Sequence, residues 1–78
     1  METKNMDKIA KRIKDTIEDS NYNQTQMAEE LEVSRRQIQR WINADQEMGI
    51  YKLKKLCQLS GVSADYILGL PEGMKRPR

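Results

Sequence analysis

The chain has 78 residues, which is room for one domain. It contains 14 Lys and Arg residues and 12 Asp and Glu residues, so the net charge is only +2. Any binding to nucleic acid must therefore come from local separation of charge. Because the chain holds no histidine and one cysteine, Cys57, it excludes an internal disulfide, a zinc site of the usual Cys/His kind and a His-based catalytic triad.

The first predicted element is a helix over residues 6–20. Its apolar residues recur at spacings of three and four and form one stripe: Met6, Ile9, Ala10, Ile13 and Ile17. Residues 1–5 and 71–78 are polar or rich in proline and cations, so we expect them to be flexible ends around a domain over 6–70. No apolar run approaches the ~18 residues of a membrane span, and the first residues do not resemble a signal peptide.

Two capping patterns predict a second and a third helix. Asn23 and Gln26 are spaced for a capping box, and Ser34 with Gln37 repeats the pattern. The helices are expected over residues 24–31 and 35–43. Their inward apolar residues are expected to be Met27, Ala28, Leu31, Ile38, Trp41 and Ile42.

Two further short helices complete the predicted domain. One covers about residues 50–60 and ends at Gly61, and Ser63 caps another that runs to about Gly69. Their expected core residues are Leu53, Leu56, Cys57, Tyr66, Ile67 and Leu70. Since no apolar pattern persists beyond four turns, the fold class is all-α: a compact bundle of five short helices.

Charge is separated along the chain. No cation lies between Lys14 and Arg35, and this stretch carries the acids Glu18, Asp19, Glu29, Glu30 and Glu32. Residues 35–43, in contrast, contain three arginines and no acid. Arginine and glutamine can each make two hydrogen bonds to one base edge in the major groove. An Arg/Gln face alone is more often simply solvated, so the interpretation depends on the spacing around it.

The stretch Gln24–Asn43 resembles the helix-turn-helix of the phage Cro/repressor (Xre-like) DNA-binding family. Ala28 stands where that pattern has a small residue at the helix crossing. The apolar residues that clamp the pair are Met27, Leu31, Val33, Ile38 and Trp41. The sequence GVSADYILG at 61–69 resembles the end of the same domain, so the likeness covers about residues 9–70 and implies a lambda-repressor-like fold.

The resemblance implies that residues 35–43 are the recognition helix in the major groove. The implied base-reading side chains are Arg35, Arg36, Gln37, Gln39 and Arg40. The implied contacts to the sugar-phosphate backbone are Asn23, Gln24 and Asn43. The loop after the recognition helix is often basic in relatives, but here Asp45 and Glu47 make it acidic. We therefore assign its phosphate contacts to Lys52, Lys54 and Lys55, for which an ordinary solvated face is the alternative.

Two departures from the family pattern predict local differences. Glu32 stands where relatives usually have glycine at the turn, and a positive φ there costs on the order of 1 kcal/mol. Ile17 and Ile42 stand where many relatives pair an arginine with a glutamate. An apolar contact is expected there in place of a buried ion pair, a replacement that is often neutral or stabilising.

The sequence thus predicts a sequence-specific, double-stranded-DNA-binding regulator of transcription, a minimal phage-type repressor in the bacterial cytoplasm, phage- or prophage-encoded. One domain reads few base pairs, so we expect a homodimer on a palindromic operator with half-sites ~34 Å apart. Its interface is expected at apolar residues near the domain's end: Tyr66, Leu68, Leu70 and Pro71. No cofactor, metal, small-molecule ligand or membrane partner is expected.

The sequence leaves two alternatives to a DNA-binding regulator. One is a protein-binding helical module, such as an antitoxin-type regulator that masks a partner; that role usually uses a long extension, which we do not expect in this chain. The other is an enzyme. It is disfavoured because the sequence shows no histidine, no metal cluster, no glycine-rich phosphate loop and no paired carboxylates in a recognisable setting.

Overall fold

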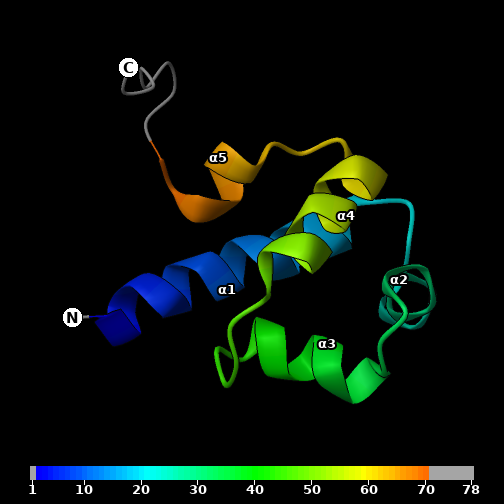
Figure 1. The fold of residues 1–78 in the computed structure, drawn as a ribbon, viewed down its shortest axis with the longest axis horizontal. Helices are drawn as coiled ribbons and strands as arrows, with labels where there is room; N and C mark the ends of the chain where they lie inside the picture. Colours follow the sequence, from blue (N-terminus) through cyan, green and yellow to red (C-terminus); the bar gives the residue numbers. More distant parts are fainter. Residues whose placement is uncertain (1, 71–78) are drawn as a thin grey trace.

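The computed structural model describes the backbone of residues 2–70 and the side chains of residues 6–70. The backbone forms five helices: α1 (Glu2–Asp19), α2 (Gln24–Leu31), α3 (Arg35–Ile42), α4 (Ile50–Ser60) and α5 (Ala64–Leu68) (Figure 1). Since this part of the chain contains no strand, the prediction of an all-α bundle is confirmed. None of these helices is long and apolar enough to cross a membrane.

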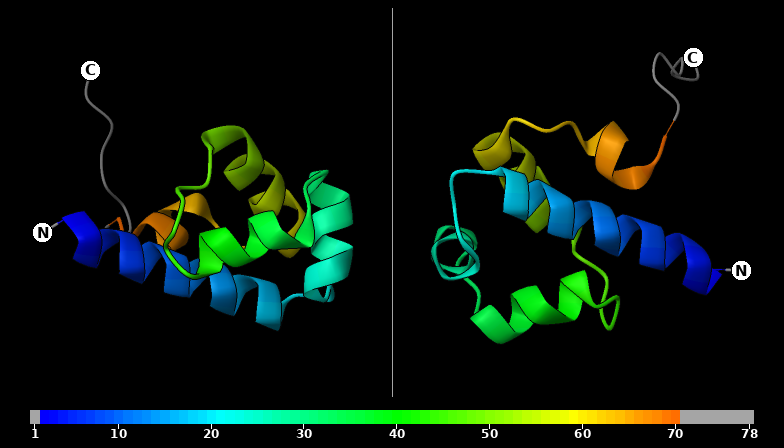
Figure 2. Two further views of the ribbon diagram at one scale, coloured as in Figure 1. Left: turned by 90° about the horizontal axis from the view of Figure 1, so that it is seen from below. Right: turned by 180° about the vertical axis from the view of Figure 1, so that it is seen from behind.

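The long helix α1 is the element against which the others are arranged. It packs against α2, α3 and α5, while α4 joins the two ends of the bundle by packing against α2 and α5. Seen from below, α3 lies in front of α1, and no other described element covers its outer side (Figure 2). The arrangement therefore leaves one long side of α3 open.

Helix α1 begins at Glu2, so the predicted helix start at Met6 is wrong by four residues. The prediction placed the start at the first residue of the apolar stripe. Residues 2–5 contain neither proline nor glycine, and a formed helix extends into water by one hydrogen bond per added residue. Met1 and the predicted tail over 71–78 lie outside the described residues.

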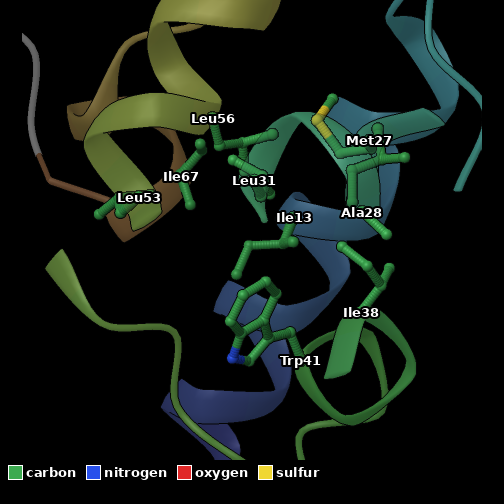
Figure 3. Close-up of a cluster of buried hydrophobic side chains, with 10 residues drawn as sticks. Ile13, Met27, Ala28, Leu31, Ile38, Trp41, Leu53, Leu56 and Ile67 are labelled. Atoms are coloured by element: carbon green, nitrogen blue, oxygen red, sulfur yellow. The ribbon is translucent and has the colours of Figure 1, made fainter. Parts of the chain in front are cut away.

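One apolar cluster joins all five helices. Its residues are Ile13, Ile17, Met27, Ala28, Leu31, Ile38, Trp41, Leu53, Leu56 and Ile67. Figure 3 shows Trp41 and Ile38 of α3 pointing toward Ile13 of α1 and Ala28 of α2. Full burial of a large apolar side chain contributes about 1.5–3 kcal/mol, so this cluster is what holds α3 to the bundle.

Ile17 is buried in the apolar cluster, and Ile42 is half-buried and packs against that cluster, so both positions belong to the apolar interior. Cys57 also packs against the cluster, as predicted. Burial raises the pKa of its thiol, which keeps it protonated at neutral pH and unsuited to act as a nucleophile.

Two residues predicted to complete the core are exposed instead. Tyr66 is 51% exposed and Leu70 is 43% exposed. Helix α5 has only five residues, and Ile67 is its one buried position. Gly69 then adopts φ 76°, which turns the chain away before Leu70. A helix of little more than one turn therefore has a single fully buried side chain, and its large apolar neighbours Tyr66 and Leu68 face the solvent.

Candidate nucleic-acid interface

The start of α2 has the predicted reciprocal cap. Oδ1 of Asn23 accepts the backbone N–H of Gln26 at 2.7 Å, and Oε1 of Gln26 accepts the backbone N–H of Asn23 at 3.0 Å. The amide NH₂ group of Asn23 is left to donate elsewhere. The cap fixes Asn23 and the neighbouring Gln24, the two predicted phosphate-binding residues, at the helix start.

The start of α3 is capped differently from the prediction. Oγ of Ser34 accepts the backbone N–H of Gln37 at 3.1 Å, as expected. The side chain of Gln37, however, does not return this bond. It donates instead to Gln46, in the loop that follows α3. The predicted capping box is therefore only half formed, and the amide of Gln37 belongs to the outer surface of α3.

The turn between α2 and α3 contains the predicted strained residue. Glu32 has φ 59° and ψ 43°, and its backbone N–H bonds to carbonyls of the last turn of α2. The backbone N–H of Val33 also donates to the carbonyl of Ala28, at 2.9 Å. This left-handed residue ends α2 and sets the angle at which α3 leaves it.

The outer side of α3 is cationic. Arg36, Arg40 and Asn43 are spaced four and three residues apart, so they lie on one face, and all three are exposed. Arg35 is exposed at the first turn. Within residues 6–70 the one ion pair joins Lys11 to Asp15, so the charges of these arginines are not neutralised by neighbours. The face is therefore available to groups that accept hydrogen bonds.

Two pairs of glutamine side chains flank this face. On one flank, Nε2 of Gln39 donates to Oε1 of Gln24, which joins α3 to the start of α2. On the other, Nε2 of Gln37 donates to Oε1 of Gln46 at 2.8 Å. Both residues of α3 are half-buried. The pairs restrict two amides that would otherwise rotate freely, and each leaves N–H groups to donate.

The loop between α3 and α4 folds back on the end of α3. The backbone N–H groups of Asp45 and Gln46 both donate to the carbonyl of Arg40, at 2.9 and 3.3 Å. Ala44 has φ 62°, which makes this reversal possible. Gln46 was not predicted as a site residue, because no spacing rule connects it to Gln37; only the folded loop brings the two together.

The three predicted phosphate-binding lysines lie elsewhere. Nζ of Lys52 donates to the carbonyl of Leu31 at 2.6 Å, so this side chain caps the end of α2. Lys52, Lys54 and Lys55 line a hollow with the acidic Glu30 and Glu32, and no residue of α3 takes part in it. The structure thus brings Asn23, Gln24 and the α3 residues together but does not bring these lysines to them.

The predicted dimer residues on α5 are accessible. Leu68 is 40% exposed, beside the exposed Tyr66 and Leu70. Pro71 lies outside the described residues. Among those residues, no group of acidic or cysteine side chains is placed to hold a metal ion.

Comparison with known proteins places this geometry in a family. The family model described as helix-turn-helix matches residues 13–67, which covers the two capped helices, the turn and most of the bundle. Neither a curated protein nor a solved structure matches the chain. With α3 held open on the bundle and its cationic face outward, the chain belongs to the helix-turn-helix family, of the Cro/C1 (Xre-like) type, and is a DNA-binding helix-turn-helix regulator.

Proposed function

We propose that the chain is a sequence-specific repressor that binds a palindromic operator as a homodimer and reads its bases with α3. The observation that carries this proposal is the outer face of α3, where Arg35, Arg36 and Arg40 are exposed and free of ion pairs within the described residues. An arginine fork can make two hydrogen bonds to a guanine, and each such pair discriminates by about 1–3 kcal/mol.

Groups beside this face position the protein on the duplex. The NH₂ groups of Asn23, Gln24 and Asn43 can donate to phosphate, as can backbone N–H groups at the start of α2. The cap and the Gln24–Gln39 pair hold the first two in place. Contacts to phosphate fix the register of α3, whereas the arginines and Gln37 and Gln39 carry the sequence preference.

The dimer part of the proposal rests on the exposed apolar residues of α5 and on Leu70, just beyond its end. Tyr66, Leu68 and Leu70 are all at least 40% exposed. The guanidinium of Arg12 in α1 lies 6.0 Å from the centroid of the Tyr66 ring, a cation–π distance that holds α5 in place. A second copy covering these residues and Pro71 would bury them and set two α3 helices one DNA turn apart.

As a regulator of this kind the protein acts in the cytoplasm, requires no cofactor or catalytic step, and blocks access of the polymerase when bound. These properties, like the phage-type character of the repressor, follow from the proposal and from the family to which the chain belongs.

Selection of binding sites from a random duplex library tests the proposal. Purified full chain is expected to enrich a short sequence repeated in inverted orientation, with centres about 10 base pairs apart. Affinity for the enriched duplex should fall steeply with added salt, because phosphate contacts release counterions. If no sequence is enriched, the repressor proposal is wrong, and an antitoxin-type role in masking a protein partner becomes the better account.

A further inference from the structure

Gln37 is held by a residue outside the recognition helix. It lies on the flank of α3 beside the arginine face, half-buried, and its Nε2 donates to Oε1 of the exposed Gln46 at 2.8 Å. Gln46 is nine residues further along the chain. The orientation of this recognition-helix side chain therefore depends on the conformation of the loop between α3 and α4.

That loop has a defined conformation. The carbonyl of Arg40 accepts the backbone N–H groups of both Asp45 and Gln46, and the half-buried Met48 packs against the apolar cluster on the far side of Gln46. The backbone of Gln46 is thus anchored on both sides. Because Gln46 does not move freely, its hydrogen bond restricts the rotamers of Gln37 before DNA is bound. Gln37 therefore loses less rotamer freedom on binding than a freely rotating glutamine would.

The hydrogen-bonding groups left on Gln37 match one base. A glutamine amide has two N–H donors and one oxygen acceptor. Gln37 uses one N–H on Gln46, which leaves one N–H and the oxygen. This is the combination that reads an adenine in the major groove, where N7 accepts and the N6 amino group donates. While bonded to Gln46, Gln37 therefore keeps one donor and one acceptor, the number that adenine needs.

A phosphate-binding role for Gln46 itself is disfavoured by its neighbours. Asp45 and Glu47 are both exposed and flank it in the chain. Two carboxylates beside a phosphate repel it, and no cation of the loop offsets them. What the loop contributes at the interface is the orientation of Gln37.

We propose that Gln46 is a positioning residue that presents Gln37 to an adenine of the operator, so that the loop after α3 sets a preference for one A·T pair. The inference rests on the proposed function, because it requires α3 to lie in the major groove. It adds to that function a second source of specificity beside the arginines.

Variants of the full chain test the proposal, after site selection with the unaltered protein. The A·T pair read by Gln37 is identified as the one whose preference disappears in Gln37→Met. In Gln46→Met, the ratio of affinities for the A·T operator and the same operator carrying G·C at that position is expected to fall about tenfold. Affinity for random duplex and the Tm should stay unchanged. The matched control is Gln58→Met, at an exposed glutamine of α4, which should change neither the affinity ratio nor the affinity for random duplex nor the Tm.

The conservative variant separates positioning from charge. Gln46→Glu keeps an oxygen that can accept from Gln37, so the A·T preference should be retained. Its added negative charge should lower affinity for all duplexes equally. The double variant Gln37→Met/Gln46→Met should discriminate no worse than Gln37→Met alone, because both changes remove the same contact.

Three outcomes overturn the inference while leaving the proposed function in place. Gln46→Met keeps the full preference at the A·T pair, it lowers affinity equally for every duplex, or the selected site has no A·T pair whose preference depends on Gln37. If the unaltered protein shows no sequence preference, the proposed function fails, and the inference fails with it.

Discussion

Nζ of Lys52, on α4, donates a hydrogen bond to the carbonyl oxygen of Leu31 in the last turn of α2, at a distance of 2.6 Å. The last carbonyls of a helix have no partner within it, and a cation there also suits the negative end of the helix dipole. Glu32, the next residue, is the left-handed residue at the turn. Lys52 thus links α4 to the turn between the two helices of the helix-turn-helix.

Replacing Lys52 should cost stability rather than DNA affinity. Lys52→Met is expected to lower the free energy of unfolding by about 1–2 kcal/mol, because a charge-assisted bond to a partly buried carbonyl is lost. Urea unfolding measures this change. Lys54→Met, an exposed neighbour on α4, should stay within about 0.5 kcal/mol of the unaltered chain. Equal stability of the two variants would contradict the capping role.

The strained turn predicts a stabilising substitution. Glu32 has φ 59°, and glycine adopts this conformation without the steric cost of a Cβ. Glu32→Gly is therefore expected to raise the midpoint of thermal unfolding, by a free-energy gain of about 0.5–1 kcal/mol. The control is Glu29→Gly, inside α2, which should destabilise by about 1 kcal/mol. If Glu32→Gly also destabilises, the turn is not strained.

A buried hydroxyl in α1 predicts a second stabilising substitution. Thr16 is 3% exposed, and its Oγ1 has no hydrogen-bond partner. Thr16→Val replaces the hydroxyl by a methyl of similar size, so the free energy of unfolding should rise by about 1 kcal/mol. Thr25→Val makes the same change at an exposed position of α2 and should be nearly neutral. Calorimetry of the three chains compares them directly, and a loss of stability in Thr16→Val would show that the hydroxyl has a partner.

The exposed apolar residues of α5 predict the oligomeric state. Sedimentation velocity should show the unaltered chain in a concentration-dependent equilibrium between monomer and dimer. Leu68→Glu should shift it to monomer, because the charge would be buried at the interface. Binding to an isolated half-site should be unaffected, while binding to the palindrome weakens.

Tyr51→Glu serves as the control for that change, since Tyr51 is 81% exposed but lies on α4, outside the proposed interface. It should dimerise like the unaltered chain. A Leu68→Glu protein that dimerises equally well would move the interface elsewhere.

The fold was largely predictable because its signals are local. Three of these signals act within one helical turn and are visible in the sequence: the Asn23–Gln26 cap, the Ser34 cap and Gly61. In the structure, a helix begins or ends at each of them. The start of α1 was not predictable in this way. Residues 2–5 carry no cap or breaker, so nothing local distinguishes a helical turn in water from a free end.

The site was less predictable because its details depend on tertiary contacts. The arginines of α3 follow from helical spacing alone. The roles of Lys52 and Gln46, in contrast, depend on partners 21 and nine residues away, which only the folded chain brings near. The residues next to Lys52 and Gln46 in the sequence do not indicate which atoms these side chains contact in the fold.

A binding measurement on single-base variants of the selected operator decides whether the arginines on the outer face of α3 read base sequence. Arg36→Ala and Arg40→Ala are each expected to relax the preference at one base pair by about 1–3 kcal/mol, while the preferences at other positions remain. Lys55→Ala, which removes an exposed cation away from α3, should leave every preference intact. If the two arginine variants instead lose affinity equally on all sequences, these residues contact only phosphate, and α3 does not read bases through them.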